Sequence, residues 1–125
     1  MLHNFLIYNQ NIKLWQRTGE SYRHILMKAL GYAMFVNDYP DLQIEMPVGL
    51  RYKPDLIVVS DQRDYKFWGE CGQNAVRKTV WLLKHTDVEK LVLFKIGQNV
   101  EQIAKLLRAE IPPKYRPPGR LILIN

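Results

Sequence analysis

Apolar residues recur along this chain with two periods, and the alternation between them predicts the order of its helices and strands. Apolar positions three or four residues apart are typical of amphipathic helices, and they predict helices over residues 21–37, 75–85 and 99–111. Shorter runs that alternate with polar residues, or are continuously apolar, are typical of strands. They predict strands at residues 5–8, 12–15, 42–46, 56–59, 66–71, 90–96 and 121–124.

The resulting order, αβββαβαβ after an N-terminal hairpin, predicts an α/β fold. We expect the three consecutive strands to be antiparallel and the later strands to join through helical crossovers. This arrangement gives a mixed central sheet flanked by helices, with residues 90–96 as an inner strand. No repeat, low-complexity stretch or linker divides the chain, so residues 1–125 are expected to form a single domain.

The first predicted helix has an apolar side and a charged side. Its apolar side is expected to pack on the core and consists of Tyr22, Ile25, Leu26, Ala29, Leu30, Ala33 and Met34. The other side carries Glu20, His24 and Lys28 at four-residue spacing. We expect these three residues to form a ladder that faces solvent, with Thr18 as a helix cap and Glu20 favourably placed in the first turn.

Two carboxylates, Asp55 and Glu70, are expected to meet at one end of a pair of strands. Asp55 opens the strand at 56–59, and Glu70 lies near the end of the strand at 66–71. If these strands pair as a hairpin, the two side chains come level with each other. Carboxylates placed close together repel and need a cation to stay ionised, and Mg²⁺ suits oxygen ligands of this kind.

Both carboxylates also have simpler roles that the sequence leaves open. An aspartate after a proline commonly caps a turn, and Glu70 can form an ion pair with Arg77 or Lys78 in the helix that follows. Asn74 is expected to cap that helix, which would begin at Ala75.

Cys71 alternates with Glu70 along its strand and is expected to point to the opposite face. No histidine lies at an evident pairing position, so we expect Cys71 to pack as a small apolar residue. The histidines His3, His24 and His85 are scattered, without the spacing of a zinc site.

The chain is basic, and its charge indicates a polyanionic partner. Lysine and arginine total 18 against 12 aspartate and glutamate residues, a formal net charge of +6. This excess favours binding to DNA or RNA, although solvated lysines account for part of it. The expected nucleic-acid contacts lie beside aromatic residues or beside the acidic pair, and they are Arg51, Lys53, Arg77, Lys78, Lys114 and Arg116.

Composition also predicts a location. A single cysteine cannot form an internal disulfide, and the first residues lack the pattern of a signal peptide, so a reducing, cytoplasmic compartment is expected. No apolar run approaches the roughly 18 residues that a membrane span needs, so we expect no membrane association.

The order of Pro54-Asp55, an interval of about a dozen residues, and Glu70 followed two positions later by a small residue resembles the motif of the PD-(D/E)XK nuclease superfamily. The segment Glu70-Cys71-Gly72-Gln73, followed by a helix with Arg77 and Lys78, is similar to that of the YaeQ-like branch of this superfamily. The resemblance covers nearly the whole chain. It implies a restriction endonuclease-like core and metal-dependent cleavage of nucleic-acid phosphodiester bonds.

The resemblance also implies roles for individual residues. Asp55 and Glu70 match the metal-binding carboxylates, and Glu20 matches an acid that often joins them from the first helix, so one Mg²⁺ or Mn²⁺ is expected. Gly72 stands where the motif usually has lysine. Lys78 or Arg77 is the expected substitute, since a nearby cation can stabilise the reacting phosphate, and Gln73 is expected to orient the water.

The replacement of the motif lysine by Gly72 keeps other functions open. One is a catalytically inactive nucleic-acid-binding or adaptor domain with the same fold, and another is a protein-interaction module without a role on nucleic acid. Cleavage that depends on Asp55 and Glu70 would separate the enzyme from both. Dimers are frequent among related folds, so a homodimer is a possible assembly.

Overall fold

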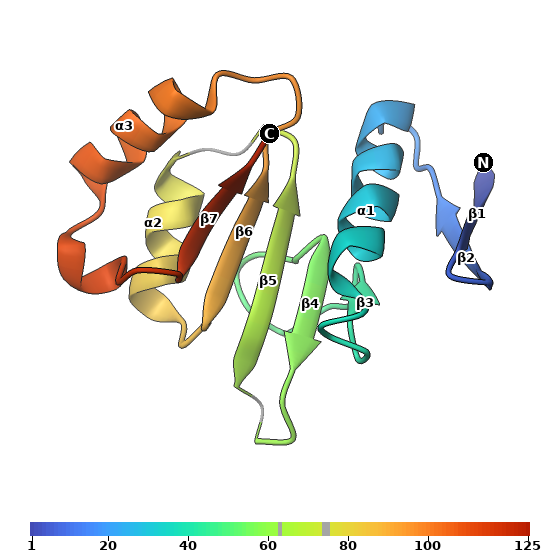
Figure 1. The fold of residues 1–125 in the computed structure, drawn as a ribbon, viewed down its shortest axis with the longest axis horizontal. Coiled ribbons are helices and arrows are strands. Elements are labelled where there is room, and N and C mark those ends of the chain that lie inside the picture. The colour runs from blue at the N-terminus through green and yellow to red at the C-terminus, as the bar shows by residue number, and fades with distance from the viewer. Residues whose placement is uncertain (63, 74–75) are drawn as a thin grey trace.

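A five-stranded mixed sheet with helices on both faces forms the body of the protein, and a two-stranded hairpin lies beside it (Figure 1). The computed structural model describes residues 1–62, 64–73 and 76–125. In chain order the elements are β1 (Leu2–Ile7), β2 (Gln10–Trp15), α1 (Tyr22–Phe35), β3 (Gln43–Ile44), β4 (Leu56–Val59), β5 (Tyr65–Cys71), α2 (Val76–His85), β6 (Lys90–Phe94), α3 (Val100–Glu110), the short 3₁₀ turn η1 (Pro113–Tyr115) and β7 (Leu121–Ile124). The predicted order of helices and strands is confirmed.

The sheet has the strand order β3-β4-β5-β6-β7 and changes direction once. β3, β4 and β5 are antiparallel neighbours, and Leu56 of β4 lies opposite Gly69 of β5. β5, β6 and β7 are parallel, with Cys71 opposite Phe94 and Phe94 opposite Ile124. The parallel strands are connected through α2 and α3, so the predicted helical crossovers are confirmed and the carboxyl ends of β5, β6 and β7 share one edge.

The N-terminal hairpin turns earlier than predicted. Its two-residue turn is formed by Tyr8 and Asn9, which both have positive φ values of 49° and 64°. A turn with two such residues matches the twist of the paired strands. The strands are therefore longer than expected, and β1 pairs with β2 along its whole length.

Each face of the sheet has its own hydrophobic core. Ile57, Trp68 and Leu91 face α2 and α3, whereas Phe67 and Phe94 face α1. The hairpin packs on the far side of α1 through a third cluster around Leu14, Ile25 and Ala29. Helix α1 is consequently sandwiched between the sheet and the hairpin, as its position in Figure 1 shows.

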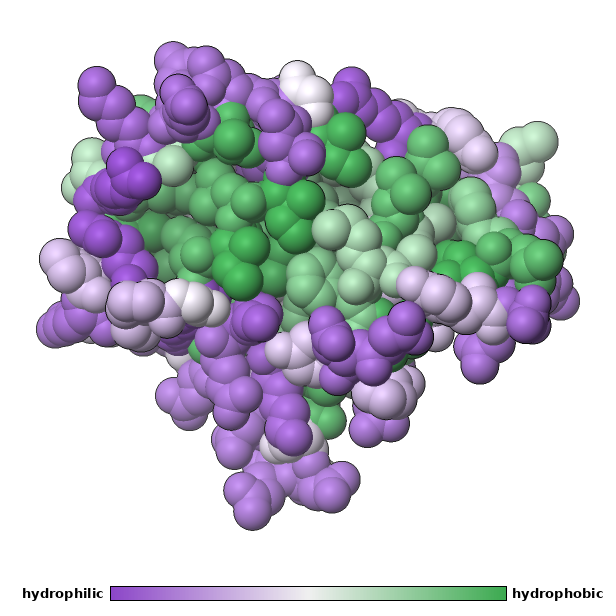
Figure 2. All heavy atoms as spheres, viewed as in Figure 1, coloured by the Kyte–Doolittle hydropathy of each residue, from purple (hydrophilic) through white to green (hydrophobic). Residues whose placement is uncertain are grey.

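The predicted orientation of α1 is wrong in part. Ile25 and Ala29 are buried as expected, but Leu30 is 45% exposed and Met34 is 51% exposed, whereas Lys28 is completely buried. Figure 2 shows an apolar area, rimmed by polar residues, that extends over α1 and the neighbouring strands of the sheet. The charged side of α1 faces inward because Lys28 forms ion pairs there with Glu20 and Glu45.

The helix ends follow local capping rules. Ser21, and not Thr18, caps α1, since its side chain accepts a hydrogen bond from the His24 amide. Asn99 caps α3 in the same way, as predicted. The predicted cap Asn74 and first residue Ala75 of α2 lie outside the described residues. In the described parts of the chain, no helix has both the length and the apolar character to cross a bilayer.

Gly31 allows α1 to lie close to the sheet. A Cβ atom at this position would lie 2.8 Å from Leu56 Cδ1 and 3.0 Å from Phe94 Cζ. The helix backbone therefore contacts the sheet directly, which brings the first turn of α1 to the edge where β5 and β6 end.

We expect Gly31→Val to destabilise the protein by about 2 to 3 kcal/mol, because a branched side chain overpacks this contact. The free energy of unfolding in urea measures the effect. Met34→Val is the matched control, since it places the same side chain at an exposed position of the same helix and should cost less than about 1 kcal/mol. Equal losses for the two variants would contradict the packing explanation.

Candidate functional site

Asp55 and Glu70 lie side by side on neighbouring strands. The Asp55 amide donates to the Gly69 carbonyl at 3.1 Å, and Oδ2 of Asp55 accepts a hydrogen bond from the Cys71 amide at 2.8 Å. Asp55 is thus bonded to the residues on both sides of Glu70. The pairing of β4 with β5 therefore brings the two predicted carboxylates together at one edge of the sheet.

Glu70 is nearly buried and already has a cationic partner. Its side chain is 3% exposed, and Oε1 accepts hydrogen bonds from Trp68 Nε1 at 2.8 Å and from Lys78 Nζ at 2.9 Å. Burial raises the pKa of the Glu70 carboxyl, and the nearby charge of Asp55 adds to this, while Lys78 opposes it. The ion pair with Lys78 is one of the simpler roles that the sequence had left open.

Lys95 is a site residue that sequence reasoning missed. It follows β6 directly, is 3% exposed, and its Nζ donates to the Gly72 carbonyl at 2.7 Å. Burial lowers the pKa of Lys95, and the charge of Glu70 opposes that effect. The sequence did contain a signal for Lys95. It follows Leu91 and Leu93 at two-residue spacing, and alternate residues of a strand point to the same face.

The backbone at Gly72 has a conformation that disfavours any side chain. Gly72 has φ +87°, a conformation that residues with a Cβ rarely adopt. His24 also passes nearby, with Cδ2 3.8 Å from the place of a Cβ on Gly72. The carbonyl of this residue accepts the hydrogen bond from Lys95, which follows the neighbouring strand β6.

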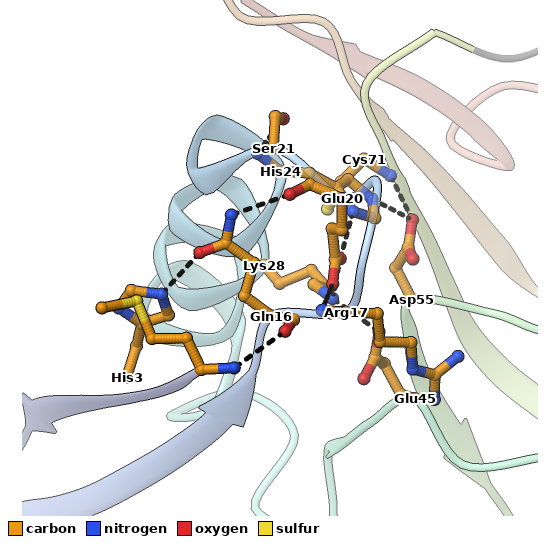
Figure 3. A network of polar contacts seen from close by, with 11 residues as sticks. His3, Gln16, Arg17, Glu20, Ser21, His24, Lys28, Glu45, Asp55 and Cys71 are labelled. Carbon is orange, nitrogen blue, oxygen red and sulfur yellow. Dashed lines mark hydrogen bonds and ion pairs between the residues drawn. The ribbon is translucent and has the colours of Figure 1, made fainter.

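A chain of charged residues links α1 to Asp55 (Figure 3). The Lys28 amine donates to Glu20 Oε2 at 2.6 Å and to Glu45 Oε1 at 2.5 Å. His24 Nδ1 lies 2.6 Å from Glu20 Oε2, and His24 Nε2 lies 3.5 Å from Asp55 Oδ2. The predicted solvent-facing ladder of Glu20, His24 and Lys28 is therefore wrong, because these residues form a partly buried network against the sheet edge.

The pKa values within this network reflect strong pairing. Partial burial alone would raise the pKa of Glu20, but hydrogen bonds from Lys28, the Arg17 amide and His24 lower it to about 2. The hydrogen bond to Asp55, aided by Glu20, raises the pKa of His24 despite its burial. Burial would lower the pKa of Lys28, but Glu20 and Glu45 together raise it. Glu20 is thus engaged by cations of the chain itself.

Two hollows open on either side of His24. The first has a volume of about 550 Å³ and lies between the start of α1 and the segments that follow β5 and β6. The second, of about 420 Å³, is bordered by Asp55, Lys53 and Glu45. Glu20 and His24 border both hollows.

Four of the other predicted residues lie around this edge. Gln73 is exposed and borders the first hollow, and Lys53 borders the second. Arg77 is exposed in the first turn of α2. Arg51 Cζ lies 5.5 Å from the ring centre of Tyr52, and Lys78 Nζ lies 5.2 Å from the same ring centre.

Lys114 and Arg116 do not join this group. They lie in the segment that leads into the start of β7, and because β7 is parallel to β5, that segment is at the opposite edge of the sheet from Glu70. Arg116 donates to the Ile111 carbonyl at 2.9 Å, and Lys114 lies 5.0 Å from the ring centre of Tyr115. The sheet thus separates the two sets of predicted nucleic-acid contacts.

The described residues include two adjacent carboxylates for a divalent ion, but no larger preformed cluster. Within residues 1–62, 64–73 and 76–125, no three histidine, cysteine, aspartate or glutamate side chains are grouped to hold a metal. Cys71 is buried in the core on the α1 side, as predicted, and burial raises the pKa of its thiol.

We expect Lys28→Met to lower the free energy of unfolding by about 3 to 5 kcal/mol, because it leaves two partly buried carboxylates without their cation. Urea unfolding measures the loss. Lys105→Met, at an exposed position of α3, should change stability by less than about 0.5 kcal/mol. A loss below about 1 kcal/mol for Lys28→Met would contradict the pairing described here.

The network also predicts an acid dependence. Because the pKa of Glu20 is about 2 in the folded protein against 4.5 for the free side chain, ionised Glu20 stabilises the fold above about pH 4.5. This stabilisation is lost as the pH falls from 4.5 toward 2. Glu20→Gln should therefore be less stable by about 1 to 3 kcal/mol at neutral pH, and its curve of stability against pH should approach that of the natural protein in acid.

Chemical unfolding at pH values between neutrality and 2 measures this convergence. The control is Glu89→Gln, which changes an exposed acid elsewhere and should leave the two curves superimposed throughout. A Glu20→Gln curve that stays parallel to that of the natural protein would show that this carboxyl is not held ionised by the fold.

Comparison with known proteins shows a likeness in fold. No protein-family model matches the sequence, and no curated protein matches it either. The solved YaeQ protein from Xanthomonas axonopodis pv. citri matches with a TM-score of 0.66 at 18% identity, and that from Pseudomonas syringae with a TM-score of 0.61 at 17% identity. Each match covers 90% of this chain and 60% of the YaeQ chain, so this chain spans about three fifths of their length. The protein therefore has a YaeQ-like mixed α/β fold.

Proposed function

We propose that this protein is a metal-dependent phosphodiesterase acting on nucleic acid, built on a restriction endonuclease-like core of the PD-(D/E)XK type. The observation that carries the proposal is the position of Lys95, whose Nζ lies 2.7 Å from the Gly72 carbonyl. Gly72 occupies the place of the motif lysine, beside Asp55 and Glu70. A lysine amine from another strand is thus hydrogen-bonded to the residue that we assign to the motif position.

The donor set fits a weakly held Mg²⁺ or Mn²⁺. The hydrogen bonds that described residues make to these carboxylates end on Oδ2 of Asp55 and Oε1 of Glu70, which leaves Oδ1 and Oε2 for a cation. Mg²⁺ commonly binds through one or two carboxylates and completes its shell with water and substrate phosphate oxygens. Glu20 contributes indirectly, because it orients His24 next to Asp55.

When bound, the ion would activate water and neutralise charge on the scissile phosphate. The side chains around it have separate tasks in the proposed reaction. Lys95 is held rigidly by burial and by its carbonyl partner, so its positive charge is preorganised for a negatively charged transition state. Gln73, exposed at the first hollow, can orient water, and Arg77 and Lys53 supply positive charge at the rim.

The second candidate function is nucleic-acid binding without hydrolysis. It is favoured by the ion pair between Lys78 and Glu70, which already neutralises one of the two carboxylates. A buried carboxylate with its own lysine is a stable arrangement that needs no metal. The formal net charge of +6 supports nucleic-acid binding in either case.

A nuclease assay with Mg²⁺ or Mn²⁺ on single-stranded and duplex DNA and on RNA tests the proposal. We expect cleavage by the natural protein and a loss of at least about 100-fold in Asp55→Asn and in Lys95→Met, which remove a metal ligand and the preorganised cation. Lys105→Met removes an exposed lysine from α3 and should cleave normally. Binding of Mn²⁺, followed by calorimetry, should be lost in Asp55→Asn and retained in Lys95→Met.

Circular dichroism and thermal unfolding establish that each variant is folded. If the natural protein binds nucleic acid in a salt-sensitive way, never cuts it and takes up no Mn²⁺, the hydrolase must be abandoned in favour of the binding function. Normal cleavage by a folded Lys95→Met variant would remove Lys95 from the mechanism.

A further inference from the structure

The hollow of about 550 Å³ between α1 and the ends of β5 and β6 extends well beyond Gln73, the one residue of it that the proposed reaction uses for orienting water. Arg23 and His24 border it from α1, Gly72 and Gln73 from the end of β5, and residues 96–98 from the end of β6. It lies at the carboxyl ends of parallel strands, where open α/β sheets commonly bind ligands. Its volume is within the range of about 300 to 1,000 Å³ usual for such sites.

Arg23 is fixed at the mouth of this hollow. Its Nη2 donates to the Ile96 carbonyl at 2.6 Å, although the residue itself is exposed. A Cβ on Gly97 would lie 2.6 Å from the same Nη2 atom, so the guanidinium rests directly on the Gly97 backbone. An arginine held by this one hydrogen bond still has several N–H donors for an oxyanion.

The positive charge of Arg23 is not cancelled within the hollow. The only carboxylate among the residues described as lining it is Glu20, which is paired with Lys28 at 2.6 Å and with His24 at 2.6 Å. Arg23 forms no ion pair with any described residue. A guanidinium that is oriented and uncompensated is suited to a phosphate group.

The hollow comes close to Asp55 through Cys71, which lines it and whose amide donates to Asp55 Oδ2 at 2.8 Å. Gly72 and Gln73, which line it, follow Glu70 by two and three residues, and Gly72 also binds the Lys95 amine. The second hollow, which contains Asp55, begins on the other side of His24. A nucleic-acid strand whose phosphate lies beside Asp55 in the second hollow can therefore continue past His24 toward Arg23.

We propose that this hollow is a phosphate-binding subsite in which Arg23 holds the phosphate next to the scissile one in a single nucleic-acid strand. The inference rests on the proposed function, since the acidic pair defines where the scissile phosphate lies. Arg23 is a substrate-positioning residue in this arrangement, and a side chain at Gly97 would force the guanidinium to move from its present position.

Fluorescence anisotropy with a labelled oligothymidylate of single-stranded DNA tests the subsite, with EDTA present so that binding is measured without cleavage. We expect Arg23→Gln to weaken binding about tenfold and to reduce the slope of log affinity against log salt by about 0.7, the value for one lost contact to a single strand. Arg108→Gln, which removes one exposed arginine from α3, should leave both quantities nearly unchanged. Arg23→Lys keeps the charge and should retain the natural salt slope with a smaller loss of affinity.

Three results would overturn the subsite: equal effects of Arg23→Gln and Arg108→Gln, weaker binding by Arg23→Gln with an unchanged salt slope, or no binding by the natural protein. The slope matters because a merely structural role of the bond to Ile96 would not change it. Cleavage in Mn²⁺ is assayed separately. Binding that depends on Arg23 without any cleavage would remove the hydrolase and retain the subsite, whereas cleavage by a protein whose binding ignores Arg23 would do the reverse.

Discussion

The ammonium group of Lys28 is completely buried, and the placement of α1 on the sheet depends on how its charge is balanced. Burial of an unpaired ion costs on the order of several kcal/mol, and partners with good geometry are needed to offset this cost. Glu20 precedes α1 and Glu45 follows β3, so the two ion pairs tie the helix to two separate loops. Glu20 then extends the same network through His24 to Asp55. As a consequence of this arrangement the outer surface of α1 is apolar, with Leu30 and Met34 exposed.

The order of elements and the meeting of Asp55 with Glu70 could be predicted from the sequence, because both follow from local periodicity and a short strand connection. The orientation of α1 could not. The apolar spacing of α1 predicted that Leu30 lies in the core. That spacing carries no information about the ion pair between Lys28 and Glu45, because these residues lie 17 positions apart in the sequence. Lys95 was visible as a charge inside an apolar run, but its partner Gly72 depends on the register of two parallel strands joined by a helix.

Two lysines converge on the region of Glu70 from different elements, and their surroundings differ. Lys78 comes from α2 and binds the carboxylate directly, whereas Lys95 comes from the end of β6 and binds a backbone carbonyl. In the proposed enzyme this division lets one lysine pair with the buried acid while the other is held beside Gly72 for the substrate. Gly72 itself has a left-handed backbone, in which a side chain is disfavoured.

The change from antiparallel to parallel pairing within the sheet has a kinetic consequence. β4 and β5 are joined by a short connection, and hairpins of this kind form in about 1 to 10 microseconds. β6 and β7 are each separated from the preceding strand by a helix, and strand pairs that lie far apart in the sequence form slowly. We therefore expect the two acids to meet during folding before Lys95 reaches Gly72. In that interval the free edge of β5 is the surface at which one chain can wrongly pair with another.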